Sequence, residues 1–207
     1  MTRIWVVRHG ESMLNAAERI QGWSDAPLTA LGREQAAERG RDFAAAGIAF
    51  DAVFSGDGMR HRETAAELLS ATGSTQQAQP DPRWRELCFG ALEGARTRKL
   101  FRVLQAHASA PDPFTATLRT LAAADPLAEA PEAVARRALA ALHDVASAGA
   151  EVLVVTSGIT ILALLRALDA ELTHLNTGPA NLSVSTIRRA GEGWTIDRIA
   201  STDPVAG

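Results

Sequence analysis

Residues 151–168 read EVLVVTSGITILALLRAL, and this stretch decides the fold class. Glu151–Thr156 gives the strongest strand signal in the chain, because it is a short, nearly continuous apolar run rich in valine. Ser157-Gly158 interrupts the run, and the apolar residues Ile159–Leu168 then predict a helix. A strand that passes through a polar, glycine-bearing turn into a helix is the repeating unit of an α/β fold.

The same unit is predicted twice more. Ile4–Val7 is a short apolar strand that ends at Arg8-His9-Gly10, and Ala52–Phe54 is another that ends at Ser55-Gly56. Helices are expected at Leu28–Ala46 with Thr29 as N-cap, at Gly58–Leu69 and at Glu132–Ala148, and a closing strand pair at Val184–Ile187 and Trp194–Ile199. We therefore predict a three-layer α/β/α sandwich with a mostly parallel sheet, whose ligands bind at the carboxyl ends of the strands.

Composition excludes several classes of function. The 207 residues suit one domain, 1–207, and a net charge of −3 gives no basic footprint for nucleic acid. Cys88 is the single cysteine, which rules out a disulfide framework or a Cys-rich zinc site. No apolar stretch approaches the roughly 20 residues of a membrane span. We expect a cytoplasmic protein, a monomer or homodimer, with no metal, no cofactor, and no nucleic-acid or membrane partner.

One region departs from the alternating pattern. Residues 107–131 are rich in Ala, Pro, Asp and Leu, with prolines marking the boundaries. We predict a helical cap or insert over 95–131 that covers the site; a surface excursion without function fits the same residues equally well.

The end of the first strand carries the strongest candidate for chemistry. A neutral imidazole at His9 could attack phosphorus while the fixed Arg8 guanidinium holds the phosphoryl oxygens. Gly10 would let backbone amides approach an anion. The alternative for His9 is a histidine that is satisfied within a loop.

Two further groups of residues could bind phosphate or substrate. Asn15, Gln21 and Gly22 follow on the same loop system, where a role in the turn is the alternative. Arg60-His61-Arg62 starts the helix after the second strand, and we expect one arginine to point into the site and the other outward.

Glu86 supplies a carboxylate next to the apolar residues Leu87, Cys88 and Phe89. Partial burial beside an anionic phosphate would favour its protonated form and make it a proton donor. An ordinary surface glutamate is the alternative.

Together these segments resemble the histidine phosphatase superfamily, which includes the cofactor-dependent phosphoglycerate mutases. The motifs that carry the resemblance are VVRHGES with Asn15 and Gln21-Gly22, Asp25–Thr29 with Gly32 and Gln35-Ala36, Ser55 with Arg60 and Thr64-Ala65, and Trp84–Glu86 with Phe89-Gly90 and Glu93-Gly94. The resemblance implies a phosphoglycerate mutase-like fold and a two-step reaction without a metal. In it His9 becomes phosphohistidine, Arg8, Arg60 and Asn15 bind the phosphoryl oxygens, Glu86 protonates the leaving alkoxide and then activates water, and Gln21 and Gly22 contact substrate.

Ser157 is a large departure from the family pattern, which has histidine before the glycine at this point. The resemblance implies phosphate-binding roles for this position and Gly158. An engineered change, a natural change that lowers activity, and a natural pseudoenzyme all fit the serine. Losing one preorganised donor costs about 10²–10³ in rate, so we expect lowered activity that Ser157→His would raise.

The chain has no obvious replacement for that histidine. His61, His107, His143 and His174 do not lie where the resemblance predicts one. His61 is the nearest to the site, but as the neighbour of Arg60 on a helix it is expected to point away.

Sequence alone favours a phosphatase that hydrolyses a small phosphorylated metabolite. The family's mutases usually have a longer chain and extra basic residues that grip the substrate carboxylate, whereas the insert between His107 and Pro131 holds only Arg119. A mutase-type phosphotransferase and a phosphate-binding pseudoenzyme remain the alternatives.

Overall fold

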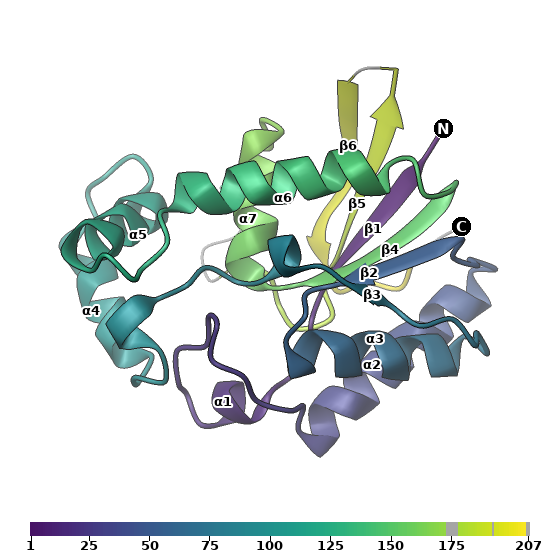
Figure 1. Cartoon of the computed structure of the whole chain (residues 1–207), viewed down its shortest axis with the longest axis horizontal. Coiled ribbons are helices and arrows are strands. Elements are labelled where there is room, and N and C mark those ends of the chain that lie inside the picture. Colours follow the sequence, from purple (N-terminus) through teal and green to yellow (C-terminus); the bar gives the residue numbers. More distant parts are fainter. Residues whose placement is uncertain (173–177, 192, 206–207) are drawn as a thin grey trace.

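The computed structural model describes residues 1–172, 178–191 and 193–205, and within them the centre of the molecule is a mixed six-stranded sheet (Figure 1). In spatial order its strands are β3 (Gln79–Pro80), β2 (Ala52–Ser55), β4 (Glu151–Thr156), β1 (Arg3–Arg8), β5 (Val184–Ala190) and β6 (Gly193–Ser201).

The sheet is parallel in its first four strands and antiparallel at its other edge. β3, β2, β4 and β1 pair in parallel, whereas β5 runs antiparallel to both β1 and β6. The predicted closing strand pair is confirmed, but both strands are longer than expected. The added residues belong to a hairpin whose β6 alternates exposed and half-buried side chains, as an edge with one solvated face does.

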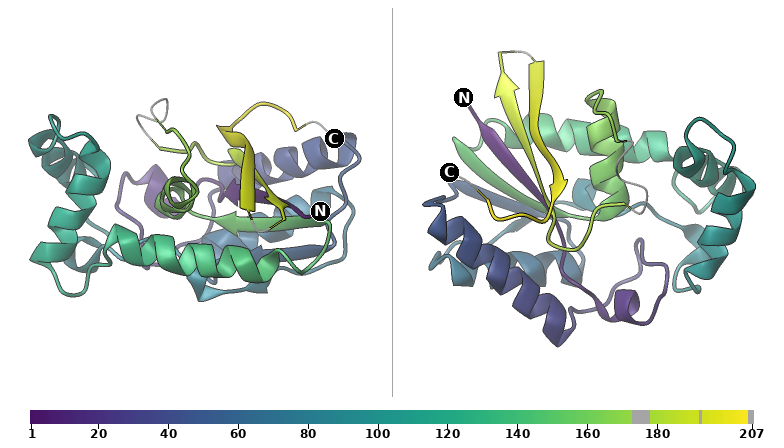
Figure 2. Two further views of the ribbon diagram at one scale, coloured as in Figure 1. Left: turned by 90° about the horizontal axis from the view of Figure 1, so that it is seen from above. Right: turned by 180° about the vertical axis from the view of Figure 1, so that it is seen from behind.

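Helices cover both faces of the sheet, so the predicted three-layer architecture is confirmed. Trp5 and Val7 of β1 pack against α2 (Ala30–Ala45) and α3 (Met59–Ala71). The alternate residues Ile4 and Val6 pack against α6 (Pro131–Val145) and α7 (Gly158–Ala167). In Figure 1, α2 and α3 lie below the strands and α6 crosses above them; Figure 2 shows the same arrangement from behind.

Local signals in the sequence set two helix starts that position the site. Thr29 caps α2 as predicted, because its Oγ1 accepts a hydrogen bond from the Gly32 amide at 3.0 Å. At the same carboxyl edge of the sheet α7 begins at Gly158, directly after the extended residue Ser157. Only Ser157 therefore separates β4 from α7, which holds its side chain at the carboxyl edge of the sheet.

The predicted insert contains two helices that stand at one end of the molecule (Figures 1 and 2). α4 spans Arg98–Ala106 and α5 spans Pro113–Ala124, and Pro113 occupies the first turn of α5, where a missing N–H costs nothing. Leu118 of α5 is buried in an apolar cluster with Leu87 and Phe89. This contact ties the insert to the segment that carries Glu86.

The remaining short elements are α1 (Met13–Ala16) and two 3-10 turns, Pro82–Trp84 and Gly90–Leu92. None of the helices in the described ranges combines the length and apolar character that crossing a membrane requires.

Candidate active site

The carboxyl ends of β1 and β4 bring two predicted site residues together. The parallel register pairs Arg8 with Thr156, and the His9 amide donates a hydrogen bond of 2.9 Å to the Thr156 carbonyl. His9 and Ser157 are the residues that follow, so they lie side by side at the sheet edge. This is the edge at which α/β sheets place their ligands.

His9 is held as a neutral imidazole with one nitrogen available. Its Nδ1 lies 2.8 Å from the carbonyl of Gly10, which can only accept, so Nδ1 carries the proton and Nε2 keeps a lone pair. The ring is 4% exposed. Burial first, and then the nearby guanidiniums of Arg60 and Arg8, hold the pKa of His9 well below its ordinary value. The geometry and the charges both suit a nucleophilic nitrogen.

Arg60 is buried and Arg8 is half-buried, and the positive charges of both act on His9. Arg8 donates from Nη1 to the Pro179 carbonyl, and Arg60 donates from Nη2 to the Gly22 carbonyl at 2.8 Å. Burial lowers the pKa of both guanidiniums, and the Glu86 carboxylate opposes that shift. Within the described residues neither Nε has a hydrogen-bond partner. Unpaired buried donors on cations are costly, so these two N–H groups are suited to an anion.

The loop after β1 organises Asn15, Gln21 and Gly22. Asn15 and Ser12 form a capping box at α1, in which Asn15 Oδ1 accepts a hydrogen bond from the Ser12 amide at 3.3 Å. The Nδ2 group is the donor that the Asn15 side chain could offer to a phosphate. Ser12 also donates to Oε1 of Gln21, and the buried Nε2 of Gln21 has no partner among the described residues. These amides stay predicted ligands.

Glu86 is 6% exposed and lies at the N-terminus of α7, where backbone groups fix both carboxyl oxygens. Oε2 accepts from the Ile159 amide at 3.0 Å, and Oε1 accepts from the amides of Leu87 at 2.9 Å and Thr160 at 3.1 Å. The surface alternative for Glu86 is therefore wrong. Its role as proton donor remains a prediction.

His61 does not point away from the site, so that expectation is wrong. Its Nε2 lies 2.7 Å from Ser157 Oγ, and its ring meets His9 edge-on with centroids 5.4 Å apart. Adjacent helix residues diverge by about 100°, but the N-terminus of α3 abuts the sheet edge, so Arg60 and His61 both reach the interior. Arg62 is exposed, which confirms the predicted split between Arg60 and Arg62.

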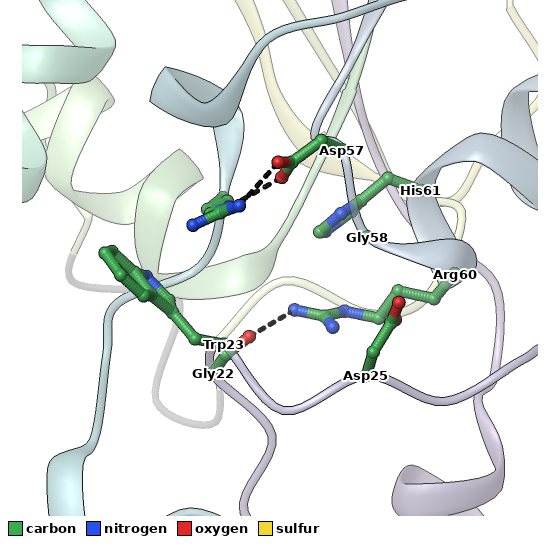
Figure 3. Close-up of a pocket in the computed structure, with 8 residues that line it drawn as sticks. Gly22, Trp23, Asp25, Asp57, Gly58, Arg60 and His61 are labelled. Carbon is green, nitrogen blue, oxygen red and sulfur yellow. Dashed lines mark hydrogen bonds and ion pairs between the residues drawn. The ribbon is translucent and has the colours of Figure 1, made fainter.

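A pocket of about 160 Å³ opens beside these residues (Figure 3). Arg60 and His61 form its wall toward His9. Across it Arg85 makes a bidentate pair with Asp57, at 2.6 Å for both bonds, and lies over the Trp23 ring. The residues that line the pocket are Gly22, Trp23, Asp25, Asp57, Gly58, Arg60, His61 and Arg85.

Gly10 serves the packing of the loop and gives no room for an anion, contrary to the prediction. A Cβ there would come within 2.5 Å of the Gly32 carbonyl of α2, and the Gly10 amide donates to Thr64 Oγ1 at 3.0 Å. The glycine therefore lets the nucleophile loop touch α2. Thr64 also donates to the Arg60 carbonyl at 2.6 Å, which links the two arginine segments.

Sequence reasoning missed two residues that shape the site. Glu93 accepts hydrogen bonds from the amides of Gly22, Trp23 and Ser24 at 2.8–3.0 Å and so fixes the loop under Arg60. Asn181 donates from Nδ2 to the His9 carbonyl at 2.7 Å. Both act across 69 residues or more of sequence, and the only signal in the chain was Glu93 within the Glu93-Gly94 motif.

The other histidines lie elsewhere. His107 contacts Thr120 of the insert, and His143 stacks edge-on against Trp194, while His174 lies outside the described residues. Across 1–172, 178–191 and 193–205, no three His, Cys, Asp or Glu side chains are grouped so that they could hold a metal ion.

A three-layer α/β protein that gathers a neutral histidine, a half-buried arginine and a buried arginine near its strand ends fits chemistry on a phosphate group. Residues 4–202 match the model of the histidine phosphatase superfamily (branch 1), so the chain belongs to this superfamily, whose members are phosphatases or mutases.

Individual relatives agree with this membership. The chain is 45% identical over 96 residues to a "Probable phosphoglycerate mutase" of Yersinia pestis (strain Pestoides F), a match that covers 45% of this chain but only 41% of that relative. A phosphoglycerate mutase structure from Bacillus anthracis str. Sterne superposes with a TM-score of 0.85 at 28% identity, covering 97% of this chain and 93% of the other. A mycobacterial glucosyl-3-phosphoglycerate phosphatase with VO3 gives 0.76 at 25% identity, covering 98% and 100%.

Proposed function

We propose that this protein is a phosphatase that hydrolyses a small phosphomonoester through a phosphohistidine on His9. The observation that carries the proposal is the imidazole of His9, whose Nδ1 proton is bound by the Gly10 carbonyl at 2.8 Å. This leaves Nε2 as a nucleophile near the guanidiniums of Arg8 and Arg60, so no separate base is needed to activate it.

In the first step the phosphoryl group binds to Arg8, Arg60 and Ser157, with Asn15 assisting, and His9 Nε2 attacks phosphorus. The N–P bond forms as the P–O bond to the leaving alkoxide breaks. Glu86 in its protonated form gives its proton to that alkoxide. The two guanidiniums neutralise charge on the phosphoryl oxygens, which is the main catalytic requirement of phosphoryl transfer.

In the second step water attacks the phosphorus of the phosphohistidine. The carboxylate of Glu86 now accepts a proton from that water, the P–N bond breaks, and inorganic phosphate leaves. His9 and protonated Glu86 are regenerated, so protons and bonds balance over the cycle.

The part of the insert between His107 and Pro131 supports hydrolysis over mutase activity, because Arg119 is its one Arg or Lys residue. A mutase needs cations for the substrate carboxylate, but Arg119 of α5 is exposed and forms an ion pair with Glu132 of α6. A solved structure named as a mutase and one named as a phosphatase have similar sequence identity to this chain, 28% and 25%. The comparison therefore does not separate the two activities. Gly22, with Gln21, is the proposed contact for substrate, because it lines the pocket beside Arg60.

The proposal is tested by phosphorus NMR on 3-phosphoglycerate and on p-nitrophenyl phosphate as a generic monoester. We expect inorganic phosphate to accumulate from at least one of them. Isomerisation of the phosphoglycerate faster than phosphate release would establish a mutase instead.

A second measurement separates an enzyme from a binding protein. Rapid quenching with a radiolabelled phosphodonor should give acid-labile, base-stable label on the natural chain and none on His9→Ala. Tight binding of inorganic phosphate without any label would establish a phosphate-binding pseudoenzyme.

A further inference from the structure

The structure places a second imidazole at the site from an unexpected element. The family resemblance expects a histidine directly after β4, where this chain has Ser157, and His61 of α3 reaches the side chain of that serine. His61 is 1% exposed and Ser157 fully buried, and their Nε2 and Oγ atoms lie 2.7 Å apart. The His61 ring also packs edge-on against that of His9.

The hydrogen-bond capacity of Ser157 limits how its hydroxyl can point. An alcohol oxygen accepts two hydrogen bonds and donates one. Arg60 Nη2, which can only donate, lies 3.4 Å from Ser157 Oγ. If His61 Nε2 donates as well, both acceptor positions are used and the one hydroxyl hydrogen is free to bond a phosphoryl oxygen.

The surroundings of the other ring nitrogen favour this tautomer. His61 Nδ1 is buried without a partner in the described part of the chain, and it faces the tight turn at Gly56, where a Cβ would lie 2.6 Å from it. Burial, then Arg60, His9 and Arg85, hold the pKa of His61 well below its ordinary value, so the ring is neutral. With the proton on Nε2, the site avoids a buried N–H at Nδ1 that would have no acceptor.

We propose that His61 and Ser157 act as one unit that replaces the expected second histidine: His61 Nε2 donates to Ser157 Oγ and orients its hydroxyl, which donates to a phosphoryl oxygen across from His9. Ser157 touches the phosphate, and His61 is a positioning residue. The inference rests on the proposed function, and it predicts substantial activity despite the serine.

The 2.7 Å contact also changes what Ser157→His should do. With His61 in place, a histidine at 157 would put its imidazole into space that the His61 ring already fills, so Ser157→His alone is expected to lower activity. The exchange variant His61→Ala/Ser157→His removes the crowding and returns an imidazole to the other side. We expect its kcat on p-nitrophenyl phosphate to exceed that of Ser157→His by at least about tenfold. The upper limit is the rate factor of about 10²–10³ that one preorganised donor supplies.

Conservative variants separate positioning from structure. His61→Gln keeps an amide donor near Nε2, whereas His61→Phe keeps a flat ring without any donor. We expect Gln to retain kcat within about tenfold of the natural chain and Phe to lose about 10²-fold, with KM changing less than kcat in both. Ser157→Ala should lower kcat as much as His61→Phe does. The double variant His61→Phe/Ser157→Ala should have a kcat no lower than either single variant, because the two residues act as a unit.

Melting curves of all variants show which of them fold. Among folded proteins, His61→Phe with natural kcat, His61→Gln as slow as His61→Phe, or losses that multiply in the double variant would each overturn the inference.

Failure of the proposed function gives a different result. If the natural chain neither labels on His9 nor releases phosphate, the phosphatase proposal fails, and the His61–Ser157 unit is then judged by orthovanadate binding in titration calorimetry. At least fivefold weaker binding in both His61→Phe and Ser157→Ala supports the unit. Unchanged binding in either variant overturns it.

Discussion

Two buried imidazoles meet at this site, one from the loop after β1 and one from the first turn of α3, and they are held in opposite ways. His9 gives its Nδ1 proton to the Gly10 carbonyl and keeps Nε2 free, whereas His61 has Nε2 engaged by Ser157 and keeps Nδ1 unpartnered. Burial and neighbouring arginines keep both neutral. Two residues of the same type are therefore suited to different tasks, depending on which ring nitrogen is hydrogen-bonded. A ring with Nε2 free is suited to attack phosphorus, whereas a ring whose Nε2 is bonded to a neighbour is suited to orient that neighbour.

The largest expected effect is on the His9 side. His9→Ala should reduce phosphomonoester hydrolysis by about 10⁴-fold or more, since removal of a covalent nucleophile leaves only binding and charge stabilisation. Initial rates with p-nitrophenyl phosphate measure the loss. His61→Phe is the matched control, because it should be slow yet still become labelled on His9; an unlabelled His61→Phe would make the two imidazoles equivalent.

Arg60 serves both imidazoles, so its loss should be the next largest. Arg60→Ala is expected to lower kcat/KM by about 10²–10³-fold, and Arg60→Lys to recover only part, because an ammonium cannot reproduce the guanidinium fork. Arg62→Ala, two residues along α3 and exposed, should stay within about twofold by the usual weakness of surface effects. Equal losses at Arg60 and Arg62 would place the phosphate elsewhere.

The shared neutrality of the two rings predicts how stability changes with pH. Both folded-state pKa values lie below that of an unfolded histidine. Below about pH 6.5 these two histidines therefore bind protons in the unfolded chain and stay unprotonated in the folded chain. The free energy of unfolding should therefore fall as the pH falls, by up to about 1.4 kcal/mol per pH unit for each ring. Urea titrations between pH 7.5 and 5 measure the slope.

His61→Gln should remove one of these two contributions and leave that of His9. A slope unchanged by the substitution would show that folding does not lower the pKa of His61. The acid limb of kcat/KM should likewise lie below pH 6.5 in the natural chain, because His9 must be neutral to attack.

The smallest effect is expected in the insert. Arg119 lies on α5 and pairs with Glu132 at an exposed position, so Arg119→Ala should change kcat/KM less than about twofold and stability by less than about 1 kcal/mol. A tenfold rise in KM for 3-phosphoglycerate would show instead that the insert binds the substrate carboxylate.

Much of the fold could be predicted because its signals are local. The runs Ile4–Val7 and Val152–Val155 are apolar on both faces, as is typical of strands covered on both sides. Thr29 marks a helix start because its side chain caps the helix. The hairpin of β5 and β6 was predicted too short, since edge strands carry half-exposed residues with a weaker pattern.

The site was predictable only in part. Arg8, His9 and Ser157 follow strands whose parallel pairing brings them together, so their neighbourhood follows from the fold class. The anion-binding role predicted for Gly10 was wrong, because the space beside this glycine is filled by a backbone carbonyl of α2. No local sequence pattern reveals that contact.

The sequence by itself determined the layers of the molecule and the strand ends at which its polar residues gather, because apolar periodicity and turn residues act within a few positions along the chain. Only the tertiary structure decided what His61 does. Helix geometry sets the angle between adjacent side chains but not what each one meets, and the packing of α3 against the sheet edge brings Nε2 of His61 to the hydroxyl of Ser157, 96 positions away.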